Sequence, residues 1–128
     1  MSEEVFDLGL SIRKKVVGEK YVNQSMSTAD DFNRDFQKLV TEYCWGAVWG
    51  REGLDHRTRS LINLSMIATL NRPHELKLHT MGALRNGVTK EEISEVLMQV
   101  AIYAGVPAGV DGFRIAREAI EQYESENS

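Results

Sequence analysis

The chain has 128 residues and a formal net charge of −4, enough for one domain with a proper core but too few for two. The largest basic cluster is Arg13-Lys14-Lys15, which argues against nucleic acid as a partner. No apolar run approaches the roughly 20 residues of a membrane span, and the single cysteine excludes a disulfide framework. The acidic N-terminus lacks the apolar core of a secretory signal, so we expect one cytoplasmic domain over residues 1–128.

The N-terminal half of the chain has two stretches of helical periodicity. Apolar residues recur at helical spacing over residues 3–17 and predict an amphipathic helix. Residues 19–27 are polar and are interpreted as a connection. Thr28 with Asp31 three positions later is close to a capping box. This pattern predicts a second helix that starts at Thr28 and runs to Trp49.

The end of that second helix is rich in aromatic residues. Tyr43, Trp45 and Trp49 fall within seven positions. Large aromatic side chains favour a core or a subunit interface, and the residues alone favour this interpretation. A second interpretation, compatible with the first, is that Trp45 and Trp49 form an apolar wall of a small-molecule pocket.

Four more helices complete an all-α prediction with six helices in total. They cover residues 56–70, 72–85, 90–103 and 107–123. Asp55 is the expected cap of the first of these helices. Apolar residues cover much of the circumference of this helix, which predicts that it is central and largely buried. Asn71 is the expected cap of the second, with Pro73 in its first turn. Thr89 and Glu92 form a full capping box before the third.

The stretch from Asn71 to His79 gathers more titratable side chains than any other part of the chain. His74 and His79 are about 140° apart around a helix, so they do not suit one metal ion, and the spacing differs from the H-E-x-x-H pattern of zinc proteases. Glu75 and His79 are one turn apart and share a face. The residues alone favour a partly buried histidine bonded to Glu75 or a carbonyl; a His/Glu site is the alternative.

Three arginine residues, Arg57, Arg59 and Arg72, lie before or within this stretch in the sequence. Arg57 and Arg59 are in the first turns of a predicted helix, where the dipole disfavours cations. They require a carboxylate partner or a bound anion, unless both extend into solvent as arginine usually does. Arg72 just precedes Pro73 and is either a bidentate clamp for a carboxylate or part of a surface or intersubunit salt bridge.

Several segments, in order and at matching spacing, resemble the carboxymuconolactone decarboxylase family. They cover nearly the whole chain from Val5 to Ile120. They are Tyr43-Cys44-Trp45-Gly46, Gly53-Leu54-Asp55, Arg57-Thr58-Arg59-Ser60-Leu61, Asn71-Arg72-Pro73-His74-Glu75-Leu76-Lys77-Leu78-His79, Asn86-Gly87-Val88-Thr89, Tyr103-Ala104-Gly105-Val106-Pro107-Ala108 and Phe113-Arg114-Ile115-Ala116-Arg117-Glu118.

The resemblance implies a six-helix bundle like that of the alkylhydroperoxidase D proteins, assembled as a homohexamer. It implies cofactor-independent decarboxylation of 4-carboxymuconolactone to the β-ketoadipate enol-lactone in the breakdown of aromatic compounds, with no metal. In the peroxidase relatives two cysteines precede the matching histidine. Arg72 and Glu75 occupy those positions here, so thiol peroxidase chemistry is not expected.

The resemblance also suggests roles for individual residues. His79 would deliver a proton or stabilise the oxyanion, and Glu75 would orient it. Arg72, and less directly Arg59, would hold a substrate carboxylate, with Trp45 and Trp49 as the apolar wall. One departure is notable, because the Trp-Gly segment of the decarboxylases continues with Glu where this chain has Ala47. The alternative is therefore a family member that acts on, or only binds, another small anionic metabolite.

Overall fold

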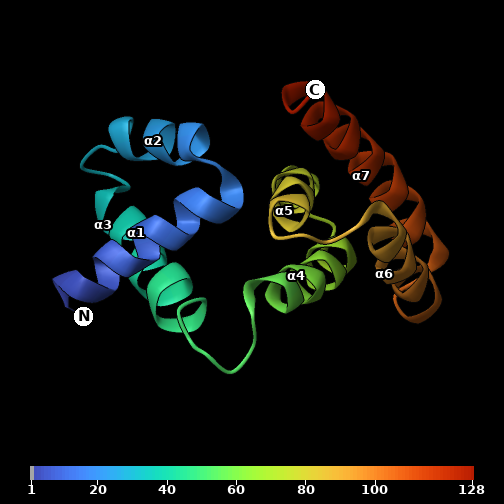
Figure 1. Cartoon of the computed structure of the whole chain (residues 1–128), viewed down its shortest axis with the longest axis horizontal. Helices are drawn as coiled ribbons and strands as arrows, with labels where there is room; N and C mark the ends of the chain where they lie inside the picture. Colours follow the sequence, from blue (N-terminus) through green and yellow to red (C-terminus); the bar gives the residue numbers. More distant parts are fainter. Residues whose placement is uncertain (1) are drawn as a thin grey trace. The chain divides into compact units, whose positions relative to one another are not determined.

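A computed structural model of the protein describes residues 2–128, and all secondary-structure elements in this part of the chain are helices (Figure 1). It contains seven α-helices and one π-helical segment, with no strand between residues 2 and 128. The all-α prediction is confirmed, whereas the count of six helices was wrong. The chain divides into two compact units, Met1–Asp55 and His56–Ser128, which are described separately.

The first unit contains α1 (Glu3–Val17), α2 (Glu19–Ser27), α3 (Arg34–Leu39) and the π-helix η1 (Val40–Val48). Helix α1 has the predicted bounds, with Ser2 as its N-cap. The predicted connection over residues 19–27 is instead helix α2. Gly18, at a φ of 99°, lets the chain reverse between the two helices, and the fully buried Val22 anchors α2 to α1. One apolar contact thus outweighs the polar composition of this segment.

The predicted helix start at Thr28 was also wrong. Thr28 closes α2, and its hydroxyl donates a hydrogen bond of 2.8 Å to the carbonyl of Gln24. The following turn is organised by Asp30, whose carboxylate accepts hydrogen bonds from the backbone N–H groups of Phe32 and Asn33. The Thr28 side chain is hydrogen-bonded to the preceding helix and therefore does not cap the next one. The Asp30 side chain stabilises the turn instead, and α3 begins only at Arg34.

Helices α1 and η1 cross at two glycines. A Cβ on Gly9 would stand 2.0 Å from the carbonyl oxygen of Thr41, and one on Gly46 would stand 2.5 Å from that of Val5. Next to this crossing, the buried Arg13 donates hydrogen bonds from Nη1 to Gln37 Oε1 at 3.0 Å and to Thr41 Oγ1 at 3.3 Å. The backbones therefore meet closely, and a buried guanidinium holds α1 to both α3 and η1.

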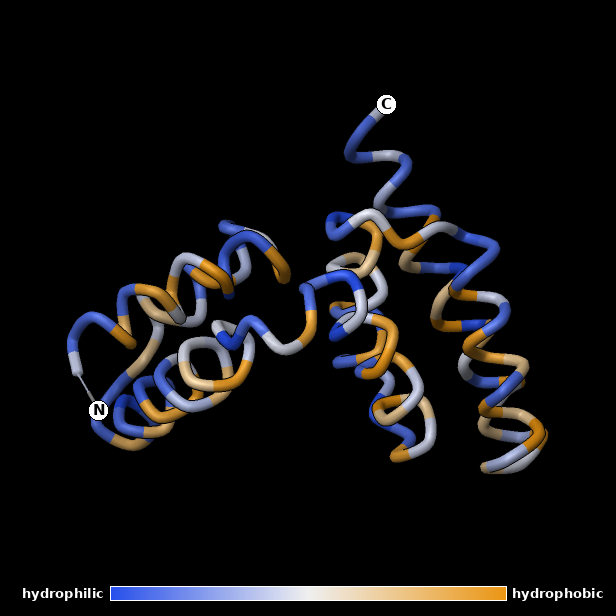
Figure 2. The backbone as a smooth tube through the Cα atoms, turned by 60° about the horizontal axis from the view of Figure 1, so that its bottom comes forward, coloured by the Kyte–Doolittle hydropathy of each residue, from blue (hydrophilic) through white to orange (hydrophobic). Residues whose placement is uncertain are grey.

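The second unit contains α4 (His56–Leu70), α5 (Pro73–Arg85), α6 (Lys90–Tyr103) and α7 (Val106–Glu126). Helix α4 packs on α5 and α6, and α7 packs on the same two helices. Apolar and polar positions are interspersed along these helices (Figure 2), and one set of the apolar residues forms a single core. Its buried members are Leu64, Ala68, Leu76, Ala83, Val88, Ile93, Leu97, Val100, Ile115 and Ala116.

Two predictions for this unit need correction. Helix α4 has the predicted bounds, but only one stripe of it is buried, and Ile62, Met66 and Leu70 are exposed. Asn71 does not cap α5. It has a φ of 58°, and its N–H bonds to the carbonyl of Ala68, so it terminates α4. Arg72 occupies the N-cap position of α5 without a side-chain hydrogen bond to the helix.

The other boundaries of this unit are close to those predicted. The capping box of Thr89 and Glu92 is confirmed, with both reciprocal hydrogen bonds present. Helix α7 begins one residue before Pro107 and continues to Glu126, past the predicted end at Tyr123. Within residues 2–128, no helix combines the length and apolar character needed to cross a membrane.

Candidate active site

The most chemically informative side chain of the second unit is His79 on α5. Helix α5 starts at Pro73, whose fixed φ suits a first turn. It buries Leu76, Thr80, Met81 and Ala83. His79 lies beside this buried stripe and is half-buried as a residue, whereas its Nδ1 atom is completely removed from solvent. The sequence-based expectation of a partly buried histidine is confirmed.

This burial changes the ionisation of His79. Removal of the imidazole from water lowers its pKa from 6.5 to about 4, although the nearby carboxylate of Glu75 acts in the opposite direction. His79 is therefore a neutral imidazole at neutral pH. A neutral imidazole can donate one hydrogen bond and accept another, but it holds no positive charge. The environment of His79 thus favours hydrogen bonding to an oxyanion over proton donation from an imidazolium.

Glu75 and Arg72 lie on the exposed part of the same segment. Glu75 is in the first turn of α5, on the solvent side. The side chain of Arg72 is exposed, and its Nη1 donates a hydrogen bond of 3.4 Å to the carbonyl of Leu70. That contact is long and neutral, so the guanidinium retains donors that can bind a carboxylate.

The two arginines of α4 have different surroundings. Arg57 forms an ion pair with Glu92, the carboxylate of the α6 capping box. The pKa of Glu92 is lowered, first by the backbone N–H of Thr89 and then by Arg57. Arg59 is half-buried and its Nε atom is shielded from solvent. The expectation that these arginines need partners is met for Arg57 by a protein carboxylate.

Trp45 and Trp49 belong to the first unit. Each is 4% exposed, and the two rings stack with centroids 4.9 Å apart and planes at 29°. The core interpretation of these residues is therefore confirmed. Ala47, between them on η1, is half-buried. Partial burial of the thiol raises the pKa of Cys44, although the residue as a whole is exposed; a raised pKa makes the thiol less nucleophilic at neutral pH.

One polar contact within the second unit was missed from the sequence. The Nδ2 atom of Asn86, directly after α5, donates a hydrogen bond of 3.0 Å to Oγ of the fully buried Ser60. The Oδ1 atom of Asn86 is buried as well. This contact joins the end of α5 to the start of α4. No local sequence signal indicates it, because the two residues are 26 positions apart.

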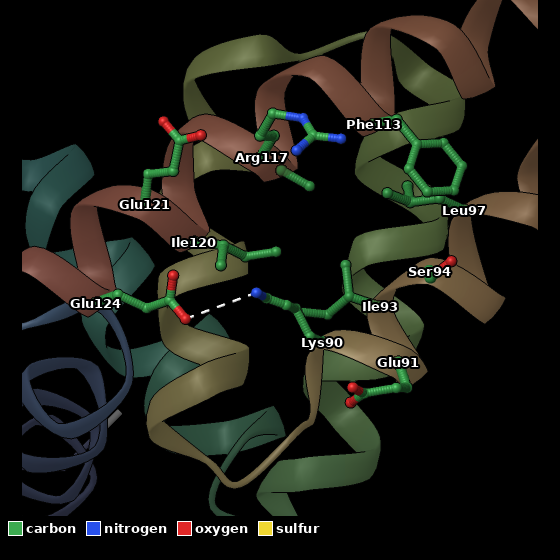
Figure 3. A pocket seen from close by; sticks show the side chains of 11 residues that line it. Lys90, Glu91, Ile93, Ser94, Leu97, Phe113, Arg117, Ile120, Glu121 and Glu124 are labelled. Carbon is green, nitrogen blue, oxygen red and sulfur yellow. Dashed lines mark ion pairs between the residues drawn. The ribbon is translucent and has the colours of Figure 1, made fainter.

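The second unit also contains a groove of about 440 Å³ between α6 and α7 (Figure 3). Its floor is apolar and includes Ile93, Leu97 and Phe113. Lys90 and Glu124 form an ion pair of 3.7 Å across one end. None of the predicted site residues lines this groove. Within residues 2–128, no three His, Cys, Asp or Glu side chains gather closely enough to hold a metal ion.

Comparison with known proteins identifies the family. The model of the carboxymuconolactone decarboxylase family matches residues 34–118. The chain belongs to this family. It is 40% identical to 4-carboxymuconolactone decarboxylase from Acinetobacter baylyi over 119 residues, which cover 93% of this chain and 89% of that protein. It is also 40% identical to nitrosuccinic acid decarboxylase from Metarhizium robertsii over 120 residues, covering 94% and 84% of the two chains.

A third relative is more distant. It is an uncharacterised 15.0 kDa protein from Paracoccus denitrificans, 33% identical over 103 residues that cover 73% of this chain and 76% of that protein. The family model includes α4 and α5 entirely. His79, Glu75, Arg72 and Arg59 therefore all lie within the part of the chain that the family shares.

Proposed function

We propose that the protein decarboxylates 4-carboxymuconolactone to the β-ketoadipate enol-lactone without a cofactor. The observation that carries this proposal is the 40% identity to a protein of that name over nearly the full length of both chains. The family model supports the same reaction class. The desolvated imidazole of His79, which interacts electrostatically with the carboxylate of Glu75, is the proposed catalytic group.

The substrate supplies its own electron sink. When the bond from the ring carbon to the departing carboxylate breaks, its electron pair moves through the ring double bond to the lactone carbonyl oxygen. The dienolate formed in this way is then protonated on the carbon next to the carbonyl, which yields the enol-lactone and CO₂. The protein has to hold the remaining carboxylate, stabilise the developing oxyanion and direct the proton.

The lowered pKa of His79 supports one of its two expected roles, stabilisation of the oxyanion, over proton delivery. At neutral pH its imidazole is neutral, so we assign it the N–H donor to the dienolate oxygen. One preorganised donor of this kind contributes roughly 3–4 kcal/mol to the transition state. A neutral donor also avoids a strong ion pair with the departing carboxylate, which would stabilise the ground state. Glu75 would orient the ring from one helical turn away.

Two arginines are proposed to bind the substrate. Arg72 is exposed and can bind a carboxylate through two parallel hydrogen bonds. Arg59 is the second candidate, because its partly buried guanidinium would interact strongly with an anion. Trp45 and Trp49 are each almost fully buried, so we propose that they stabilise η1 by packing in the interior of the first unit.

We further propose that the protein is cytoplasmic. We also propose that it forms a homohexamer, as the resemblance implies. Many large apolar side chains are exposed among residues 2–128, including Phe32, Phe36, Leu70, Ile102 and Tyr103. Large exposed apolar patches mark association surfaces on soluble proteins. This supports self-association without fixing the number of subunits.

The deciding experiment is turnover of freshly prepared 4-carboxymuconolactone by the purified protein in the presence of a chelator. CO₂ release and appearance of the enol-lactone should proceed together at an enzyme-like rate. If the folded protein releases no CO₂ from this substrate, the proposal is wrong. A thiol-dependent peroxide assay on the same preparation should show no activity.

Nitrosuccinate is a second candidate substrate, because the chain is equally identical to the fungal nitrosuccinic acid decarboxylase. Both named substrates are dicarboxylates whose reactive carbon can pass an electron pair to an oxygen, of a lactone in one case and of a nitro group in the other. Ala47, where the resemblance expects Glu, favours an altered specificity. The ratio of kcat/KM for the two substrates, measured with the wild-type protein and with Ala47→Glu, decides between them.

A further inference from the structure

A row of large and unusually exposed apolar side chains lies along α3 and η1 and in the turn just before α3. Phe36 and Leu39 lie on α3, Tyr43 follows four residues later on η1, and Phe32 lies in the turn just before α3. All four are exposed, and Phe32 is 97% exposed. We call this row the aromatic stripe. The charged residues of the same segment, such as Arg34 and Lys38, lie between these positions, so the stripe itself carries no charge.

The area of the stripe matches one side of a stable interface. A large aromatic side chain contributes roughly 150–250 Å², so at the observed exposures the stripe presents on the order of 500 Å². A standard interface buries about 800 Å² per partner, of which roughly 450 Å² is apolar. A patch of this size lies at or near the upper limit of what monomeric proteins usually leave exposed.

The second unit contains a groove of matching chemistry between α4 and α6. It has a volume of about 390 Å³, and Met66, Leu70, Val100 and Tyr103 line it. Tyr103 is 84% exposed, and the remaining lining side chains are small or uncharged. We call this the uncharged groove. An apolar helix face can enter it without removing a charge from water, which would otherwise oppose binding.

We infer that the aromatic stripe of one copy of this chain binds in the uncharged groove of a second copy. A row of side chains along a helix can lie in a shallow groove between two helices, as in other helix-in-groove interfaces. The contact is heterologous, because two different surfaces of the chain meet. Repeated head to tail, such a contact closes into a ring when the rotation permits. The inference rests on the proposed homo-oligomer and names the surfaces that build it.

The test uses two full-length variants that each disable one surface. Phe36→Arg places a charge in the stripe, and Met66→Arg places one in the groove. Both positions are exposed, so both variants should retain the helical content of the wild type by circular dichroism. Analytical ultracentrifugation should show a smaller assembly for each variant alone. Phe36→Leu and Met66→Leu, the matched controls, should keep the wild-type mass.

Mixing the two variants is the decisive step. Phe36→Arg keeps an intact groove and Met66→Arg keeps an intact stripe, so one intact contact forms between them. The mixture should contain a one-to-one complex that native mass spectrometry identifies by its mass. The complex cannot extend, because its remaining stripe and groove are both disabled. If mixing produces no such complex, or if Phe36→Arg retains the wild-type mass, the inference is wrong. A monomeric wild-type protein would instead overturn the oligomer proposal itself.

Discussion

The imidazole of His79 has a pKa of about 4 because burial lowers it more than the carboxylate of Glu75, one helical turn earlier on α5, raises it. The neutral form therefore persists down to mildly acidic pH. An uncharged donor beside a carboxylate suits a reaction in which negative charge moves from a departing carboxylate to a carbonyl oxygen.

Replacement of His79 should reduce catalysis in a graded manner. His79→Ala removes the donor and should lower kcat/KM by about 10²–10³, the usual cost of one oxyanion donor. His79→Gln keeps an N–H group and should lose less. The exposed His74 on the same helix provides the control, and His74→Gln should retain wild-type activity. If kcat/KM of His79→Ala stays within a few-fold of the wild type, the assigned role is wrong.

The depressed pKa of His79 also predicts how stability depends on pH. In the unfolded chain this histidine binds a proton near pH 6.5, whereas in the folded protein it does so only near pH 4. Between these values the unfolded state binds more protons, so the free energy of unfolding falls as the pH is lowered from 6.5 to 4. The loss at the low end is roughly 3 kcal/mol at most. Above pH 6.5 this residue contributes no pH dependence.

Urea unfolding followed by circular dichroism at several pH values measures this effect. His79→Gln cannot titrate, so its stability should fall less steeply than that of the wild type between pH 6.5 and pH 4. Parallel curves for His79→Gln and the wild type would show that burial does not depress the pKa of His79.

Arg72 should affect substrate binding more than the chemical step. Arg72→Ala removes a charge-assisted contact worth roughly 1.5–3 kcal/mol, so KM should rise by about 10- to 100-fold with a smaller change in kcat. Arg72→Lys should recover only part of this loss, because an ammonium group cannot make the bidentate contact. Arg117→Ala on α7 removes an exposed cation from another helix and should leave KM unchanged. A KM for Arg72→Ala equal to that of the wild type would exclude Arg72 as the clamp.

The parts of the fold that were predictable from sequence depend on local chemistry. Helix α6 was located by its capping box, since Thr89 and Glu92 are three residues apart and satisfy each other's backbone. The bounds of α1 and α4 followed from periodicity. Helix α2 was missed because its stability comes from a single buried residue, Val22, packed against another helix. A polar segment with one anchor cannot be told from a loop by composition.

The candidate site was predictable to a similar extent. The one-turn spacing of Glu75 and His79 fixed their shared face, but the strength of desolvation at His79 depends on how α5 packs in the second unit. The partner of Arg57 was equally hidden, since Glu92 is 35 residues away. The π-helical geometry of η1 has no sequence signature of its own, and no local contact within residues 2–128 explains it.

The closest backbone approach in the first unit gives the last prediction. A Cβ on Gly9 would stand 2.0 Å from the carbonyl oxygen of Thr41, and neither backbone can move without separating α1 from η1. Gly9→Ala should therefore destabilise this unit by roughly 3 kcal/mol or more. Gly53→Ala is the matched control, because no atom lies within 4 Å of a Cβ at that position.

The natural fluorescence of the chain measures this effect selectively. Its two tryptophans, Trp45 and Trp49, both belong to the first unit and are buried against each other. The tryptophan signal should therefore show a lower urea midpoint for Gly9→Ala and an unchanged midpoint for Gly53→Ala. Because the cost comes from steric overlap, Gly9→Ser should be at least as destabilising as Gly9→Ala. A wild-type midpoint for Gly9→Ala would mean that α1 and η1 do not cross at this glycine.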